Sequence, residues 1–277
     1  MTFIVISMLL LAFTLIPILF MVTTSLKSPM EIRTAGTLLP GAELYWENWT
    51  RAYRNVPVHI YLLNSTLTAI FSAALAIVLA LPVSYVIARF NFGGSLLPSW
   101  ILGTYVTPPI VIAIPVFMLF RQIDSLPLIK DTIGWIDTVH GLALVHAVGS
   151  LPVAVWMLES FIHKVPHELD ESAWLDGASR LRTVWSIIVP VILPGIIATF
   201  IICMILSWNE FLFALILTYS DASQTFPIGI SNFIGEHGQQ FGEMSAAALG
   251  GLVPIFVLAL IFQRYLVEGL SEGSVKS

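Results

Sequence analysis

The chain has 277 residues, of which 57% are hydrophobic and 10% are charged, whereas a soluble domain carries roughly 25% charged residues. A surface with so little charge would be insoluble in water, which excludes an ordinary cytosolic enzyme. The formal net charge of −5 offers no basic patch, so nucleic acid is not an expected partner.

Six apolar blocks follow one another along the chain, and only the fifth contains a charged residue, Glu210. Each block has about 20 residues or more, enough for a helix to cross the hydrocarbon core of a membrane. The strands of a membrane β-barrel would instead alternate in hydropathy over about 10 residues. The sequence therefore predicts an all-α polytopic membrane protein with a single transmembrane domain over residues 1–277. The expected spans are residues 3–22, 62–88, 96–120, 138–158, 191–219 and 244–263.

Prolines interrupt the third span, where Thr107 is followed by Pro108 and Pro109. A proline removes a backbone hydrogen bond and bends or breaks a helix. In lipid the freed carbonyl group must find a partner, so such a break faces protein or a water-filled path. Pro108 is therefore a candidate for the lining of a transport pathway, although a kink that only improves helix packing would explain the same residues.

The fourth connection, residues 159–190, is the most charged part of the chain. Pro166 suits the first position of a short helix, and Gly177 suits the left-handed residue that follows its last turn. Ser179 is placed to cap a second short helix, which Pro190 is expected to stop. Two short helices joined at a glycine elbow are therefore predicted to project from the membrane.

The first of these short helices is expected to present Leu169, Ala173 and Asp176 on one face, with Ser172 beside it. Small side chains on a helix face allow another protein to approach the backbone closely. An amphipathic hairpin that lies on the lipid is the alternative. The polar face of such a hairpin is usually basic, whereas acidic and basic residues are balanced here, so a docking element is favoured.

A known motif coincides with this loop. It reads Glu-Ala-Ala, three residues, Gly, nine residues, and then Ile-x-Leu-Pro. This chain has Glu171-Ser172-Ala173, then Gly177, then Ile187-Ile188-Val189-Pro190 at the same spacing, and it departs from the motif at Ser172 and Val189. With it, the chain resembles the permease subunits of bacterial binding-protein-dependent ABC importers.

Two further segments, Trp208-Asn209-Glu210-Phe211 and the tail from Gln263 to Leu270, are similar to the carbohydrate-uptake branch of that family. This branch includes the smaller permease of the maltose transporter. The resemblance implies the type I ABC importer permease fold, with six transmembrane helices and a cytoplasmic coupling helix. It also implies a sugar as the transported substrate, such as an oligosaccharide, a disaccharide or a related glycoside, moved by alternating access.

The same resemblance implies a set of partners. They are a second homologous permease in a heterodimer, two ABC ATPase subunits, an extracytoplasmic solute-binding protein and the membrane lipid. It assigns ATPase docking to Glu171, Ser172, Ala173, Asp176, Gly177 and Ala178. The chain has no G-x-x-x-x-G-K-[ST] loop that could cradle ATP. No cofactor, metal ligand or catalytic residue is therefore expected in this chain, and ATP and magnesium belong to the partner subunits.

Other candidate residues depend on their place in the chain. An ionisable residue inside a span is costly and often functional, so Trp208, Asn209 and Glu210 join Pro108 as candidates for the substrate pathway. A hydrogen bond between helices, or a carboxylate that reaches the membrane interface, explains Glu210 equally well. His146, within the fourth span, fits either helix packing or proton transfer. In the fifth connection, residues 220–243, the candidates for contact with the binding protein are Glu236, His237 and Gln239.

The orientation cannot be read from charge, because the two sides of the predicted topology carry six Lys or Arg residues each. The first block lacks a basic n-region and a cleavage pattern, so a retained helix is expected. The resemblance places the loop at residues 159–190 in the cytoplasm of a bacterium. Both termini are then on the cytoplasmic side of the inner membrane.

Two rival functions belong to other classes. A stand-alone secondary transporter would normally show more membrane-embedded charge and an inverted repeat. An intramembrane hydrolase would need a motif such as G-x-S-x-G or H-E-x-x-H, and the chain has neither. A permease subunit is the preferred interpretation.

Overall fold

A computed structural model of the chain describes residues 2–34, 38–126, 134–235 and 238–274. Within these ranges the chain is helical, apart from a single antiparallel pair of two-residue strands, β1 (Ile234–Gly235) and β2 (Gly238–Gln239). The chain forms two compact units, one from residues 1–62 and 225–257 and the other from residues 63–224 and 258–277. Two long helices, α4 (Val58–Phe90) and α14 (Phe241–Ser274), contribute to both units.

The first unit also contains α1 (Thr2–Ser25), α2 (Pro29–Thr34), α3 (Glu47–Asn55) and α13 (Phe226–Ser231). Its core places small side chains against aromatic rings. Ala52 of α3 and Ala246 of α14 are fully buried, and they belong to one cluster with Tyr61, Phe226 and Phe233. In contrast, every side chain of α1 from residue 4 to residue 17 is exposed, as expected for a helix solvated by lipid.

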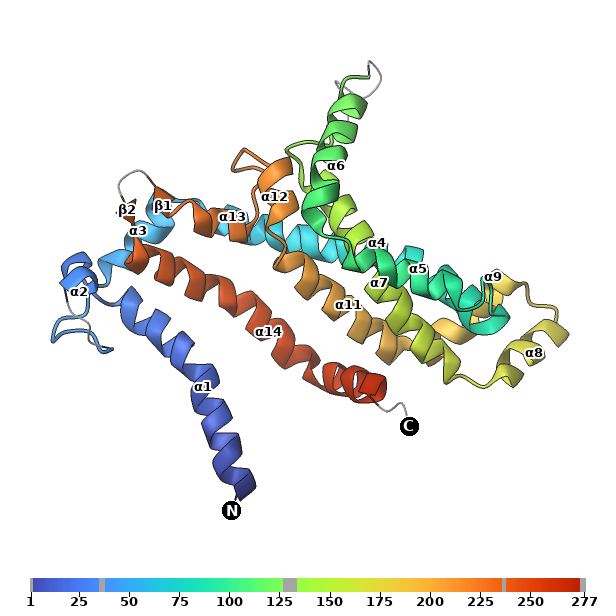
Figure 1. The fold of residues 1–277 in the computed structure, drawn as a ribbon. Coiled ribbons are helices and arrows are strands. Elements are labelled where there is room, and N and C mark those ends of the chain that lie inside the picture. Colours follow the sequence, from blue (N-terminus) through green and yellow to red (C-terminus); the bar gives the residue numbers. More distant parts are fainter. Residues whose placement is uncertain (1, 35–37, 127–133, 236–237, 275–277) are drawn as a thin grey trace. The chain divides into compact units, whose positions relative to one another are not determined.

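The second unit contains the remaining helices, most of which are labelled in Figure 1. They are α5 (Leu96–Val106), α6 (Pro109–Asp124), α7 (Val139–His163), α8 (His167–Leu175), α9 (Arg180–Thr183), the π-helical turn η1 (Val184–Ile188), α10 (Val189–Val191), α11 (Leu193–Trp208) and α12 (Leu212–Leu217). Helix α7 is central, because α5, α11 and α12 all pack against it.

Helices α7 and α11 approach each other closely at Gly195. A Cβ atom on this glycine would lie 2.4 Å from the ring of Phe161 on α7, which is a steric clash. The absence of a side chain at Gly195 is therefore what lets the two helices pack here. Figure 1 shows α7 and α11 side by side.

Four of the predicted spans are confirmed as helices that are long and apolar enough to cross a membrane. Within the described residues they are Ile4–Ser25, Val58–Phe90, Val139–His163 and Phe241–Gln263. The other two expected spans are bent pairs of helices, so the described chain has up to six spans if each pair counts as one.

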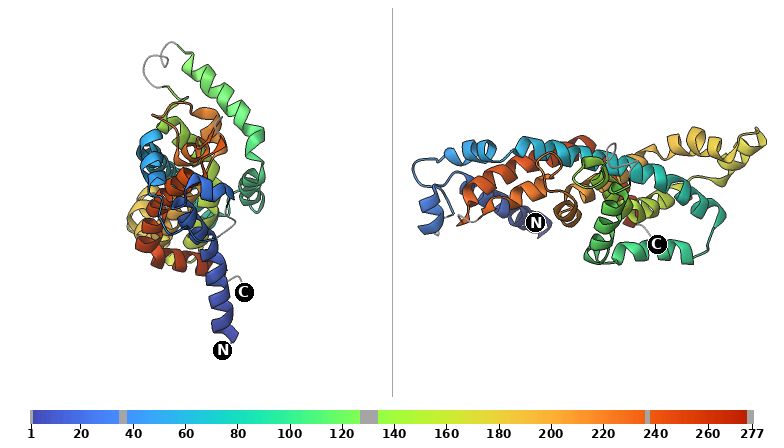
Figure 2. Two further views of the ribbon diagram at one scale, coloured as in Figure 1. Left: turned by 90° about the vertical axis from the view of Figure 1, so that its left-hand side faces the viewer. Right: turned by 90° about the horizontal axis from the view of Figure 1, so that it is seen from above.

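The third span is broken at the position where its prolines predicted a break in the helix. Helices α5 and α6 meet at an angle of 87°, and the right view in Figure 2 shows them nearly perpendicular. The break falls at Thr107 and Pro108, whose backbones are extended. Pro109 then opens α6, at a position where its missing N–H is not needed.

The fifth span differs from the expectation. The predicted helix at residues 191–219 is interrupted after Trp208, and α12 begins only at Leu212. The helix that Pro190 was expected to stop ends at Val191, one residue later, and the chain bends by 84° before α11. Pro190 directly follows the π-helical turn η1 in this continuous stretch.

Candidate functional site

The predicted docking loop forms two short helices, α8 and α9, at one end of the second unit (Figure 1). The sequence predicted Pro166 as the first residue of this helix, whereas α8 begins one residue later, at His167, with Pro166 in the N-cap position. After α8, Gly177 has a φ angle of +82°, which confirms the left-handed elbow. The side chain of Ser179 then accepts a hydrogen bond from the backbone of Arg182, which confirms the cap of α9.

Helix α8 exposes two of the three residues of its predicted docking face. Its buried residues are Asp170 and Ala173, whereas Leu169 is 39% exposed and Asp176 is also exposed. The docking face predicted from Leu169, Ala173 and Asp176 is therefore wrong in one member, Ala173. Ala173 lies on the inward side of α8 together with Asp170, which has a polar partner there.

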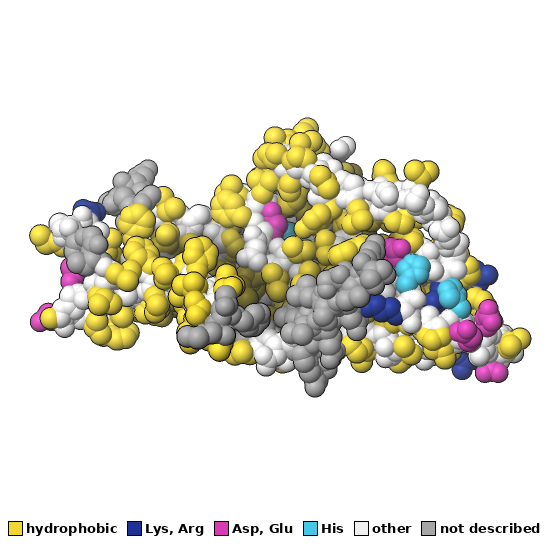
Figure 3. Space-filling view, turned by 60° about the horizontal axis from the view of Figure 1, so that its bottom comes forward, with side chains coloured by type: hydrophobic (Ala, Val, Ile, Leu, Met, Phe, Trp, Pro, Cys, Tyr) yellow, Lys and Arg dark blue, Asp and Glu magenta, His cyan; other side chains and the backbone are white. Residues whose placement is uncertain are grey.

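The proposed docking residues lie on the accessible side of this loop. Glu171, Ser172, Asp176 and Gly177 are exposed, Ala178 is partly buried, and Ala173 is buried beneath them. Charged side chains gather at this end of the second unit (Figure 3). A Cβ atom on Gly177 would meet no atom within 4 Å, so the elbow is open to an incoming surface.

The partner of Asp170 is the end of α4. The Asp170 carboxylate lies 2.9 Å from the guanidinium of Arg89 and accepts a hydrogen bond of 2.6 Å from the Tyr85 hydroxyl. The sequence did not identify Asp170 as a residue with a distant partner. The one feature of the sequence that pointed to such a partner is Arg89, a basic residue at the end of an otherwise uncharged span. It did not identify Asp170, because several carboxylates could have paired with Arg89.

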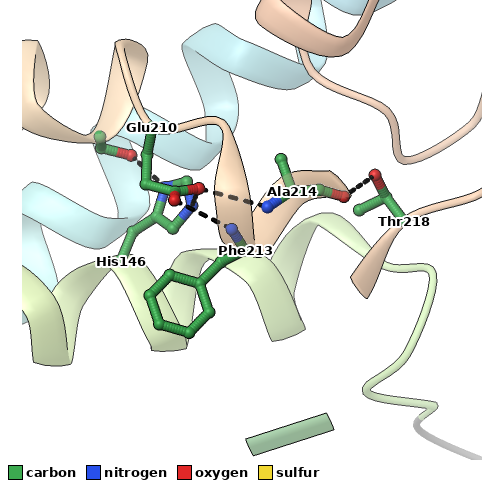
Figure 4. Close-up of polar contacts among 6 residues, drawn as sticks. His146, Glu210, Phe213, Ala214 and Thr218 are labelled. Atoms are coloured by element: carbon green, nitrogen blue, oxygen red, sulfur yellow. Dashed lines mark hydrogen bonds and ion pairs between the residues drawn. The ribbon is translucent and has the colours of Figure 1, made fainter. Parts of the chain in front are cut away.

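The second cluster surrounds Glu210, at the break between α11 and α12. Oε2 of Glu210 lies 3.0 Å from Nε2 of His146 on α7, and the other ring nitrogen of His146 lies 2.7 Å from the Ser207 hydroxyl. The Glu210 carboxylate also accepts hydrogen bonds from the backbone N–H groups of Phe213 and Ala214, at 2.9 Å and 3.2 Å. Figure 4 shows the carboxylate between the histidine ring and the start of α12.

These contacts fit the structural alternatives for the two residues, a hydrogen bond between helices for Glu210 and helix packing for His146. Glu210 makes the interhelical hydrogen bond to His146, and it also satisfies the first N–H groups of α12, which have no partner within that helix. His146 has both ring nitrogens in contact with neighbours, as expected of a packing residue. The pair therefore fixes the helix break.

The remaining pathway candidates are distributed around the two breaks. Trp208 is buried and Asn209 is exposed, with its amide donating to the carbonyl of Ile205 at 2.8 Å. Pro108 lies at the break between α5 and α6. Because α12 packs against α6, the helices that follow the two breaks meet in the second unit.

Asp137 connects two further loops in this unit, a role that its sequence context does not predict. Its φ angle is +59°, and its backbone N–H donates to the carbonyl of Leu217 at 2.8 Å. One carboxylate oxygen accepts hydrogen bonds from the backbone N–H groups of Tyr219 and Ser220, both at 2.9 Å, and from the Ser223 hydroxyl. Burial opposes ionisation, but the hydrogen bonds from Ser223 and Ser220 outweigh it and lower the pKa of Asp137.

Replacing Asp137 by asparagine is expected to lower the free energy of unfolding by about 1 kcal/mol at neutral pH, because the charge-assisted hydrogen bonds become neutral ones. Asparagine tolerates the left-handed backbone, so the variant isolates the charge. A carboxyl group with a lowered pKa stabilises the fold above its unfolded pKa and loses that contribution as the pH falls through the folded value.

Thermal unfolding in detergent at pH 7 and below pH 4 measures this. The difference between wild type and Asp137→Asn should be present at pH 7 and shrink in acid. A difference of the same size at both pH values would contradict the role of the charge.

Two of the three residues suggested for contact with a binding protein, Glu236 and His237, lie outside the described residues. The third, Gln239, belongs to β2, whose backbone pairs with β1. No group of three or more potential metal ligands occurs within the residues that the structure describes.

Comparisons with known proteins agree with this architecture. Residues 72–272 match the family described as binding-protein-dependent transport system inner membrane component. The chain is 34% identical to the trehalose/maltose transport system permease protein MalG of Thermococcus litoralis, over 83% of this chain and 81% of that protein. It is 32% identical to the trehalose transport system permease protein SugB of Mycobacterium tuberculosis, over 98% of this chain and 96% of that protein.

A solved structure shows the same fold. A chain of a bacterial ABC transporter involved in the import of the acidic polysaccharide alginate superposes with a TM-score of 0.74. The match covers 95% of this chain and 96% of the other, at 16% sequence identity. The expected fold of an ABC importer permease is thus confirmed.

Proposed function

Since this chain belongs to the family of inner membrane components of binding-protein-dependent transport systems and is an ABC importer permease, we propose that its cargo is a sugar. Several relatives carry names of sugar transporters, among them trehalose and maltose systems. The proposed substrate is therefore an oligosaccharide, a disaccharide or a related glycoside. In a heterodimer the two permeases would share the pathway, so residues of both chains would select among these sugars.

The observation that carries the coupling role is the docking loop. It presents an exposed carboxylate, Glu171, beside the open elbow at Gly177. A carboxylate at the rim of such a surface can make a charge-assisted bond to a basic residue of an ATPase. Glu171, Ser172, Ala173, Asp176, Gly177 and Ala178 form the proposed docking surface.

The assembly in this proposal contains a second homologous permease, two ABC ATPases and an extracytoplasmic solute-binding protein. ATP and magnesium bind to the ATPases, which carry out hydrolysis, and this chain contributes no catalytic residue. The α8 loop and both termini lie on the cytoplasmic side of a bacterial inner membrane. The loop with Glu236, His237 and Gln239 then lies outside, where it would contact the binding protein.

Alternating access requires helices that can change their angle without losing hydrogen bonds inside the membrane. The breaks at Pro108 and at Glu210 are suited to this, because each already ends one helix and begins another. Trp208, Asn209, Glu210 and Pro108 are the proposed residues of the pathway or of its gate.

Purification of the chain from its native membrane in mild detergent tests the assembly. An ATPase subunit and a second, homologous membrane chain should co-purify at fixed ratio. A chain that purifies alone and still takes up substrate after reconstitution would contradict the proposal and favour a secondary transporter.

A binding experiment on the soluble partner tests the substrate class. Calorimetric titration of the solute-binding protein encoded beside this chain should give saturable binding to trehalose, maltose or another glycoside. Methionine serves as the control ligand. Binding of an amino acid with no binding of any sugar would contradict the proposed cargo.

A further inference from the structure

We propose that Tyr85, Arg89 and Asp170 form a joint that fixes the docking helix α8 to α4 and transmits the movement of α8 to it. The three are positioning residues, which act through α8 and touch neither the substrate nor ATP. This proposal rests on the proposed coupling function.

The joint consists of two residues of α4 and one of α8. Tyr85 and Arg89 lie one helical turn apart near the end of α4, so their side chains share one face. Each contacts a different oxygen of the Asp170 carboxylate. One oxygen accepts a hydrogen bond of 2.6 Å from the Tyr85 hydroxyl, and the other lies 2.9 Å from the guanidinium of Arg89. The side chains of Arg89 and Asp170 are 1% and 2% exposed, so water does not compete for this pair.

A second contact holds the other side of the elbow to the same helix end. The guanidinium of Arg180, the first residue of α9, lies 4.5 Å from the ring centroid of Phe90, the last residue of α4. It also lies 5.8 Å from the ring of Trp174 on α8, and the rings of Phe90 and Trp174 are stacked with centroids 6.3 Å apart. Both helices that flank Gly177 are therefore attached to the end of α4.

The buried charges of Arg89 and Asp170 do more than hold α8 against α4. An apolar pair of similar volume would hold two helices together equally well, without the desolvation of two ions. An apolar contact can slide, whereas the hydrogen bond from Tyr85 is directional and the ion pair with Arg89 is costly to separate in a medium of low dielectric constant. When an ATPase moves α8, displacing the end of α4 costs less than separating Arg89 from Asp170.

Two adjacent carboxylates of α8 then have different tasks. Asp170 points inward to Arg89, and Glu171 is exposed on the docking side. Within the described part of the chain, Asp170 is the only carboxylate at ion-pair distance from Arg89, and no guanidinium nitrogen of Arg89 has a hydrogen-bond partner there, so Arg89 depends on the charge of Asp170. Removing the charge of Asp170 would therefore leave a buried guanidinium with no counter-ion.

The experiment uses the complete transporter, reconstituted in lipid vesicles with its binding protein, and measures sugar imported per ATP hydrolysed. Asp170→Asn keeps the size of the side chain but removes its charge, and it should lower this ratio about tenfold, the effect of weakening one contact by 1.4 kcal/mol. The matched control is Glu168→Gln on the exposed side of α8, which should leave the ratio unchanged. Combining Arg89→Asp with Asp170→Arg should restore part of the ratio.

The readout separates positioning from mere stability, because a structural defect lowers the yield of complex without changing the ratio in the complexes that form. If Asp170→Asn does not assemble, Tyr85→Phe removes the hydrogen bond alone and decides the question. An unchanged ratio in the assembled variant overturns the joint while wild-type coupling still supports the proposed function. Uptake by the wild type without ATP would instead overturn the proposed function itself.

Discussion

Replacing Gly177 by aspartate should uncouple the transporter, with sugar uptake falling about tenfold or more while ATP hydrolysis continues. The chain itself can accept this change. A Cβ atom at Gly177 meets no atom within 4 Å, and aspartate is among the residues that adopt a positive φ angle. The added carboxylate also precedes the start of α9, where negative charge is favourable. The expected loss therefore comes from the ATPase, which would meet a new, charged side chain at the elbow.

The chain offers a matched control for this variant. Gly94, in the turn after α4, also has a positive φ angle, +55°, and open space around its Cβ position. Gly94→Asp imposes the same backbone requirement and adds the same charge at a residue outside the six proposed docking residues, so it should keep uptake and hydrolysis coupled. Equal coupling in the Gly177 and Gly94 variants would exclude the elbow from docking.

Replacing Glu210 by alanine should lower the free energy of unfolding by about 3 kcal/mol, because three hydrogen-bonding contacts are lost at about 1 kcal/mol each. The N–H groups of Phe213 and Ala214 and the ring of His146 would all lose their acceptor. Because the same contacts hold the break between α11 and α12, uptake should fall more than the stability loss explains.

Thermal unfolding in detergent and uptake by reconstituted vesicles measure the two effects. Glu210→Gln keeps one acceptor oxygen and should lie between wild type and Glu210→Ala in both. Glu159→Ala is the control on α7, since Glu159 has only a contact of 3.5 Å with an exposed His163, worth well under about 1 kcal/mol. If the Glu159 and Glu210 variants were equally stable, the network around Glu210 would have no structural role.

The spans and the elbow follow from short-range rules, which explains why the sequence predicted them. A run of uncharged residues such as 62–88 has one stable solution in lipid, a helix, and the structure places α4 there. Pro108 breaks the third span because its ring and missing N–H act within one turn. Gly177 behaves as predicted because few other residues adopt its backbone angles.

The inward contacts of the loop depend on residues that are distant in the sequence. Spacing within α8 placed Leu169, Ala173 and Asp176 on one docking face, but Ala173 is buried, because Arg89 on α4 holds the neighbouring side of α8, with Asp170, inward. For Glu210 the sequence supplied the right alternatives, and the choice needed the position of His146 on another helix.

The central claim is that this chain is the membrane subunit of an ATP-driven sugar importer. Uptake of the labelled sugar recognised by the binding protein, into vesicles that hold the complete complex, tests it most directly. The predicted result is uptake that requires ATP, the binding protein and this chain together, and that is lost when Glu171→Lys reverses the charge of the docking surface. Uptake by this chain alone, driven by an ion gradient in the absence of ATP, would contradict the claim.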